Sequence, residues 1–243
     1  MVRSLCFFLI VSAIFAILSC SDDSRFTDEP PPAVIWVVPS SDLDQNERGI
    51  DALPEGTSIQ LNWYRSTNDL VVGYELYRST ERSGSYQIIA NKQVLKNDDT
   101  LYVDVVDPSM VNRRLYYYMT AVNDIGTRSE PSDTISYRLI EKATNLLPQG
   151  SIAERRPVFS WTDLNQINNY IIRVLKSESG NYIWICHTFG VYGPTVQQIE
   201  YNIDGSALLD SLNSGEEYIW RVDIVGPENN SGSESQWAVF QIQ

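Results

Sequence analysis

The chain contains short runs in which apolar residues occupy every second position. In residues 58–64, for example, Ile59, Leu61 and Trp63 alternate with polar residues. Successive side chains of a strand point to opposite faces, so this spacing predicts strands with one buried face. Further strands are expected at 33–38, 73–79, 86–90, 101–105, 115–123 and 134–139. Turn-forming residues separate these runs, and no amphipathic helix is evident, so the first half predicts a β-sandwich of ~100 residues.

The second half repeats this pattern after a short connector at 141–150. Its strands are expected at 144–147, 156–161, 170–174, 182–187 and 218–222, with Trp237 and Phe240 on the last one. A mature chain of about 220 residues can hold two ordinary domains. The sequence therefore predicts an all-β protein with two tandem sandwiches, domain 1 at 33–140 and domain 2 at 141–243.

Several of these residues resemble those of fibronectin type III domains, which have an immunoglobulin-like fold. In the first half the matching positions are Trp63, 73–79, 121–123, Gly126 and 129–132. In the second half, the matches are the Pro-x-Phe-x-Trp pattern ending at Trp161 and the Tyr-x-Trp-Arg-Val pattern beginning at Tyr218. Tyr218 takes the family's inward corner position, whereas Leu115 occupies it in the first half. The resemblance implies two fibronectin type III-like domains and says almost nothing about a ligand.

An apolar run at 5–18 follows Arg3 and ends in the sequence Ile-Leu-Ser-Cys at 17–20. The run has the length of a signal-peptide core and is shorter than the ~20 residues of a membrane-spanning helix. Its last residues resemble the lipobox of bacterial lipoproteins. This resemblance implies that residues 1–19 are a signal peptide and that Cys20 carries acyl chains such as palmitate, which anchor the protein in a membrane. The alternative is a plain secretory signal with a coincidental cysteine.

Residues 20–32 are expected to be a flexible tether that follows the lipidated cysteine. They are acidic, then rich in proline, and contain few apolar residues to stabilise a fold. Ser21, Asp22 and Asp23 resemble the surface-export tag of Bacteroidetes-type outer-membrane lipoproteins, although a solvated acidic spacer has the same composition. We therefore expect an outer-membrane lipoprotein of the cell envelope that faces the cell surface.

The charge and the reactive residues disfavour several functions. The formal net charge of −13 argues against a nucleic-acid partner, because phosphates are neutralised by Lys and Arg. The chain has one histidine, His187, next to Cys186 on an expected strand, where the two side chains would point to opposite faces. One histidine cannot supply a histidine-based metal cluster. We expect no catalytic residues and no cofactor.

Two sets of residues are candidate binding sites. Asp42, Asp44 and Asn46 place oxygen atoms at alternate positions, as calcium-binding loops do, but an ordinary acidic loop explains them equally simply. The second set is aromatic, because exposed aromatic rings can stack on sugars, although sandwich strands also carry large aromatic residues inward. Its members are Trp36, Tyr182, Trp184 and Tyr192.

The sequence thus predicts a non-enzymatic lipoprotein that acts as a protein-interaction, adhesion or scaffold module. Exposed edge strands of its sandwiches could pair with an envelope protein. The alternative is a glycan-binding accessory lipoprotein of a polysaccharide-uptake system.

Overall fold

The computed structural model describes residues 29–243. The expected signal peptide (1–19), Cys20 and most of the expected tether lie outside the described residues. Domain 1 contains β1 (Asp51–Ala52), β2 (Ser58–Asn62), β3 (Val71–Ser79), β4 (Gln87–Ala90), β5 (Leu101–Val105), the short 3-10 helix η1 (Pro108–Met110), β6 (Arg114–Asn123) and β7 (Ile135–Leu139). Domain 2 contains β8 (Thr144–Leu147), β9 (Gly150–Ile152), β10 (Val158–Thr162), β11 (Asn169–Lys176), β12 (Tyr182–Phe189), β13 (Val196–Glu200), β14 (Glu217–Val225), β15 (Ser231–Glu234) and β16 (Ala238–Ile242).

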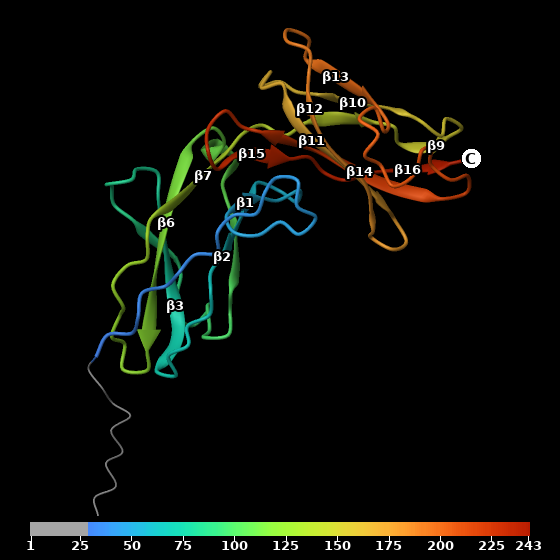
Figure 1. Cartoon of the computed structure of the whole chain (residues 1–243). Helices are drawn as coiled ribbons and strands as arrows, with labels where there is room; N and C mark the ends of the chain where they lie inside the picture. Colours follow the sequence, from blue (N-terminus) through green and yellow to red (C-terminus); the bar gives the residue numbers. More distant parts are fainter. Residues whose placement is uncertain (1–28) are drawn as a thin grey trace, which may run out of the picture.

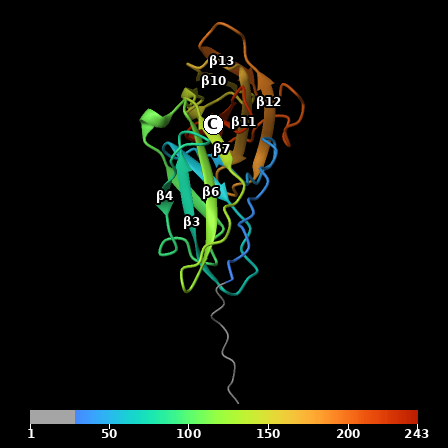
Figure 2. The same ribbon diagram turned by 90° about the vertical axis from the view of Figure 1, so that its left-hand side faces the viewer.

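The strands pack as sandwiches, which confirms the predicted all-β class. A sheet of order β1-β2-β5 lies in domain 1 and one of order β13-β10-β8 in domain 2. The third sheet runs through both domains in the order β12-β11-β14-β15-β7-β6-β3-β4, and β16 and β9 extend it beside β14 (Figures 1 and 2). The described chain has two separate hydrophobic cores, one bounded by Val34 and Leu139 and the other by Ile140 and Ile242, and the names domain 1 and domain 2 refer here to the parts around these cores.

The expected strand at 33–38 is reduced in the structure to a single bridge between Trp36 and Trp63. Two backbone hydrogen bonds flank it, from Val37 N to Asn62 O and from Tyr64 N to Ile35 O. Pro39 follows directly and cannot donate a backbone hydrogen bond, so the ladder ends there. This segment is extended, but it is too irregular to form a named strand.

Each of the two cores contains a tryptophan packed against a tyrosine. Trp63 meets Tyr74 edge-on with ring centroids 5.6 Å apart, and Trp161 meets Tyr170 in the same way at 4.9 Å. Edge-to-face contacts of this kind are worth ~0.5–1.5 kcal/mol beyond the area that they bury. Trp63, directly after β2, and Trp161, on β10, thus take equivalent places in the two cores.

The corner tyrosine differs between the domains. In domain 2, the hydroxyl of Tyr218 accepts a hydrogen bond from the backbone N–H of Asn213 at 3.0 Å, as the sequence resemblance implied. In domain 1, Leu115 occupies that position and is fully buried. Two residues later, Tyr117 donates from its hydroxyl to Asp104 Oδ2 at 2.8 Å. Domain 1 therefore ties its sixth strand to β5 through a buried tyrosine–carboxylate bond instead.

The domains are joined by a direct strand pair. β15 runs parallel to β7, with Ser231 opposite Arg138 and Gly232 opposite Leu139. The backbone N–H of Ile140 also donates to Gly232 O at 3.1 Å. The large sheet is thus continuous across the boundary (Figure 1). Within residues 29–243, no helix has the length and apolar character needed to cross a bilayer.

Candidate functional site

Two of the candidate ligand-facing aromatic residues are buried. Trp36 is 8% exposed, and its indole Nε1 donates to Asp133 O at 2.8 Å. Trp184 is 1% exposed, and its Nε1 donates to Asp204 Oδ1 at 2.9 Å. The ligand-facing interpretation is therefore wrong for both, because each ring lies inside a sandwich and its one polar atom is already paired.

The other two candidates do not form a platform with each other. Tyr182, at the start of β12, is half-buried, and the guanidinium of Arg173 lies 5.9 Å from its ring centroid. Tyr192 is 87% exposed and lies in the loop after β12. The structure therefore does not bring the four predicted aromatic residues together.

The candidate calcium loop binds an arginine of the other domain. The main-chain carbonyls of Asp42 and Asp44 accept hydrogen bonds from Arg173 Nη2 and Nη1 at 2.6 and 2.9 Å. Asn46 is exposed in the same loop. Because a guanidinium already occupies the carbonyl oxygens, the loop serves to dock domain 1 on domain 2.

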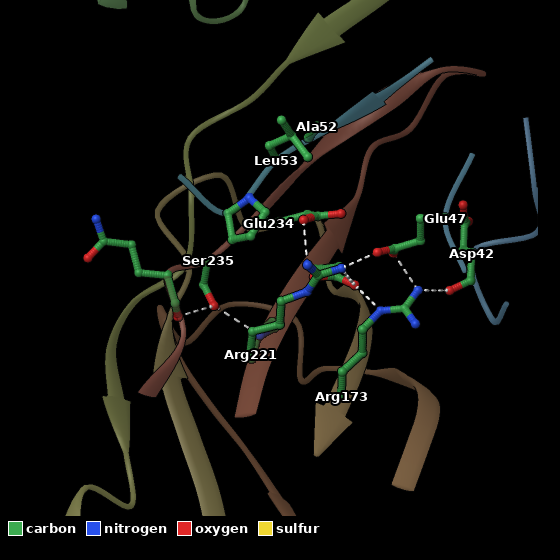
Figure 3. A network of polar contacts seen from close by, with 12 residues as sticks. Asp42, Glu47, Ala52, Leu53, Arg173, Arg221, Glu234 and Ser235 are labelled. Carbon is green, nitrogen blue, oxygen red and sulfur yellow. Dashed lines mark hydrogen bonds and ion pairs between the residues drawn. The ribbon is translucent and has the colours of Figure 1, made fainter. Parts of the chain in front are cut away.

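A buried ionic seam surrounds this contact and consists of Glu47, Arg173, Arg221, Asp223 and Glu234 (Figure 3). Glu47 comes from the docking loop of domain 1 and pairs with Arg173 at 2.5 Å and with Arg221 at 2.6 Å. Arg173 lies on β11 and has an entirely buried side chain. One carboxylate of domain 1 thus bridges two arginines of the neighbouring strands β11 and β14.

The carboxylates of domain 2 complete the seam. Asp223 Oδ2 accepts from Arg173 Nε at 2.7 Å, and Asp223 Oδ1 lies 2.8 Å from Arg221 Nε. Glu234 on β15 forms an ion pair with Arg221 at 2.6 Å that lacks good hydrogen-bond geometry. Both side chains of this pair are only 5% exposed. The two arginines therefore face three carboxylates, those of Glu47, Asp223 and Glu234, and cannot neutralise all of them.

This excess of carboxylates changes their proton affinity. Burial raises the pKa of Asp51 to about 7, and the nearby charge of Glu47 adds to the effect. Burial also raises the pKa of Glu234, with Asp223 as the next largest cause. The hydroxyl of Tyr137 donates to Asp51 Oδ1 at 3.1 Å. We therefore expect at least one carboxyl group here to be protonated near neutral pH.

Carboxylate oxygens of Glu47, Asp51 and Glu234 lie within 4.8 Å of one another, a spacing that a cation could bridge. The guanidinium of Arg221 already pairs with Glu47 and Glu234, however. The positive charge at this place is thus supplied by the protein itself. We interpret the cluster as a structural junction between the domains.

A groove of about 630 Å³ lies beside this junction, between residues 142–150 and the start of β16. Trp237 lines it, and the guanidinium carbon of Arg221 lies 4.9 Å from the centroid of its ring. The amide side chains of Asn145, Gln149 and Gln236 also line the groove, and all three residues are exposed. The groove therefore combines an aromatic ring with several amides.

Cys186 and His187 do not form a catalytic pair. Cys186 is buried in the core of domain 2, and burial raises the pKa of its thiol to about 12. The imidazole Nε2 of the exposed His187 lies 2.7 Å from Asn169 Oδ1. The prediction that the two side chains point to opposite faces is confirmed.

The seam and the groove were not predicted from the sequence. Arg221 and Asp223 alternate with the core residues Trp220 and Val222 on β14, which places them on its outer face. That alternation was the available signal, but it cannot show that a loop covers the face. Trp237 was expected only as a residue of the last strand.

No protein-family model matches the chain. Over 102 residues, or 41% of its length, the chain is 31% identical to an amylopullulanase of Thermoanaerobacter thermohydrosulfuricus, and it spans only 6% of that protein. A crystal structure of chicken CNTN1 FN1-FN3 domains is similar over 88% of this chain and 69% of that chain, with 12% identity and a TM-score of 0.36. The Clostridium perfringens spore cortex lytic enzyme SleM is similar over 44% and 27%, with 20% identity and a TM-score of 0.27. Both TM-scores are low, so the fold assignment rests on the strands described above.

Proposed function

We propose that the chain is a non-enzymatic outer-membrane lipoprotein that presents two rigidly joined sandwiches at the cell surface as an adhesion, scaffold or protein-interaction module. The ionic seam is the observation that carries this proposal. Arg173 donates to two main-chain carbonyls and pairs with a carboxylate of the docking loop, so separating the domains would break all of these charge-assisted contacts. A fixed angle between the domains suits a protein that holds a binding surface at a set position.

The anchoring part of the proposal rests on the sequence around Cys20. Acylation at this residue would attach the molecule to the membrane through its N-terminal end. The chain enters domain 1 at its first core residue, Val34, so domain 2 would lie on the far side of domain 1 from the attachment point (Figure 1). The two domains would then extend outward from the membrane in order.

Labelling with radioactive palmitate tests the anchor. We expect the wild-type chain to incorporate the label and to fractionate with the outer membrane, and the Cys20→Ala variant to lose both properties. Digestion of intact cells with protease should remove domain 2 if the protein faces outward. An unlabelled chain, or a Cys20→Ala variant that remains in the membrane fraction, would contradict the anchor.

Distance measurements between two spin labels, one in each domain, test the rigid junction. We expect one narrow distance distribution for the full chain and a broad one for Glu47→Ala, which removes the carboxylate that bridges the two arginines. A distribution that is already broad in the wild type would contradict the rigid-scaffold proposal, whatever the outcome of the palmitate labelling.

A second candidate function is that of a glycan-binding accessory lipoprotein. Two observations favour it: the stretch of 102 residues that is similar to an amylopullulanase, and the groove that places Trp237 next to amide side chains. A glycan array probed with the full chain tests this function directly. Binding to a defined group of saccharides would support it, and an array without signal would rule it out.

A further inference from the structure

The groove beside the ionic seam has the chemistry of a small-molecule site. Its volume of about 630 Å³ falls within the range of ~300–1,000 Å³ that is typical of ligand pockets. Its apolar walls come from Leu146, Ala238 and Val239, and its polar groups come from side chains that project from exposed residues. An apolar surface with a few polar groups is the usual composition of such sites.

The groove offers no free charge to a ligand. Lys142 is the one ionisable residue among those that line it. Its ammonium group donates to Leu53 O at 2.6 Å and to Pro54 O at 2.8 Å, both in domain 1. Because these bonds direct the charge toward the domain boundary, the groove suits a neutral ligand.

The amides provide both kinds of hydrogen-bonding group. Asn145 Nδ2 donates to Thr162 Oγ1 at 3.2 Å, and Gln149 Nε2 donates to Leu146 O at 2.7 Å. Each of these side chains therefore keeps a carbonyl oxygen that can accept from a hydroxyl group. The exposed amide of Gln236 adds a further donor and acceptor.

Trp237 contacts the ionic seam through Arg221. The guanidinium of Arg221 lies 4.9 Å from its ring centroid, and Glu47, Asp223 and Glu234 fix that guanidinium in turn. A cation over an aromatic ring is attractive, so the indole is restrained before any ligand arrives. A restrained ring loses less conformational entropy on binding.

We propose that this groove binds a neutral saccharide, with Trp237 stacked on the C–H face of a sugar ring and the amides of Asn145, Gln149 and Gln236 bonded to its hydroxyl groups. A sugar presents apolar C–H patches next to many hydroxyls and carries no charge, which matches each property of the groove. The proposal rests on the glycan-binding candidate function and adds the site to it.

Affinity electrophoresis of the full chain through gels that contain pullulan or amylose tests the site, with a glycan array to widen the choice of saccharide. These polymers are chosen because the name of the similar amylopullulanase refers to them. We expect wild-type retardation, at least tenfold weaker binding for Trp237→Ala, and a loss of a few fold for Gln236→Ala. The matched control is Tyr192→Ala, which removes an exposed aromatic residue of domain 2 outside the groove and should bind as the wild type does.

The outcomes separate the site from the function. If the wild type and Trp237→Ala bind a glycan equally, or if Tyr192→Ala alone abolishes binding, the site is wrong while the function stands. If no glycan binds the wild type, both are wrong. If instead a peptide from a displayed library binds and requires Trp237, the groove takes an extended chain and the saccharide proposal is overturned. Equal melting temperatures for Gln236→Ala and the wild type show that its effect is not a loss of folding.

Discussion

The outer face of the large sheet carries a similar ion pair in each domain, but the arginine of the pair is open to solvent in one domain and buried in the other. On domain 1, Arg128 pairs with Glu75 at 2.7 Å; the arginine side chain is 54% exposed, although the carboxylate of Glu75 is buried. On domain 2, Arg173 pairs with Asp223 at the same distance and is completely buried. The difference comes from the docking loop of domain 1, which covers β11 and β14. The comparison shows that coverage by another segment, and not the pairing itself, turns a surface ion pair into a junction.

The pKa values of the carboxyl groups also differ between the two faces. The hydrogen bonds from Arg128 lower the pKa of Glu75 below its usual value. Burial raises the pKa of Glu47 although two arginines contact it. On the outer face of domain 1, tyrosines lie beside Glu75 instead: the hydroxyl of Tyr77 donates to Glu75 Oε2 at 2.6 Å, and its ring stacks on Tyr118 with centroids 4.5 Å apart. Domain 1 can thus shield its outer face with its own side chains, whereas domain 2 needs domain 1 to do so.

The largest expected effect is that of Glu47→Ala. The substitution leaves Arg173 and Arg221 buried with one carboxylate fewer, and breaking a buried pair in this way costs about 3–5 kcal/mol. Denaturant unfolding measures the loss of stability, and hydrogen exchange of the β14 amide groups shows that the loss lies at the junction. The matched control is Glu228→Ala, because Glu228 also pairs across the boundary, with Arg114 and Arg138, but at the exposed rim. We expect little change there, and equal effects of the two variants would contradict the comparison.

The pH dependence of the junction should be the next largest effect. Asp51 has a pKa of about 7 in the folded protein against an ordinary value of 3.8, so the folded state holds this proton more tightly. The stabilisation that this proton gives the folded state is complete below pH 4 and is lost as the pH rises toward 7. Between pH 5 and 8 we expect the free energy of unfolding to fall by about 2–3 kcal/mol, at ~1.4 kcal/mol for each pH unit of the difference.

Asp51→Asn provides the control for this slope, because the amide resembles the protonated acid at every pH. Thermal unfolding at several pH values should show a flatter dependence for the variant than for the wild type. A wild type that becomes more stable from pH 5 to pH 8, with a variant that follows the same curve, would show that Asp51 is ionised in the folded state.

The corner residues sharpen the comparison between the two cores. Tyr218→Phe removes the acceptor of the Asn213 N–H and should cost about 1 kcal/mol. Tyr117→Phe in domain 1 should cost less, because Asp104 keeps two contacts with Arg78 at 2.8 and 2.9 Å. Unfolding midpoints of the two variants provide the measurement. A larger loss in Tyr117→Phe would mean that the buried tyrosine of domain 1 contributes more than the corner of domain 2.

The smallest effect is expected from Arg128→Ala. An ion pair whose arginine is about half exposed contributes about 0.2–1 kcal/mol, and salt screens it; the buried Glu75 keeps the hydroxyl of Tyr77 as a hydrogen-bond donor at 2.6 Å. We therefore expect a small decrease in stability that disappears when unfolding is repeated in molar salt. A decrease that salt does not change would indicate that the stem of Arg128 matters through packing.

The sequence predicted the sandwiches because their core residues repeat locally. The alternation of Ile59, Leu61 and Trp63 with polar residues predicts one strand within five residues. By contrast, β15 reads Ser-Gly-Ser-Glu and has no apolar residue to mark a buried face. Its burial comes from its position between β14 and β7, which the local pattern does not encode.

The site was less predictable because its residues are far apart in the chain. Glu47 lies 126 residues from Arg173 and 174 residues from Arg221. Each looks like an ordinary surface charge in its own segment, and only the docked structure brings them into contact. The acidic side chains mark the loop at 42–46 in the sequence, but its main-chain carbonyl groups, which every residue has, are the atoms that contact Arg173.

The docking loop also determines where the protein can be divided. A cut after Leu139 would separate the two hydrophobic cores cleanly, yet it would leave β15 as an open sheet edge and expose two arginines that lack their bridging carboxylate. The isolated second half would then present an unpaired strand to other molecules, which is a template for aggregation. For expression and crystallisation, the smallest useful fragment of this protein is therefore the pair of domains together.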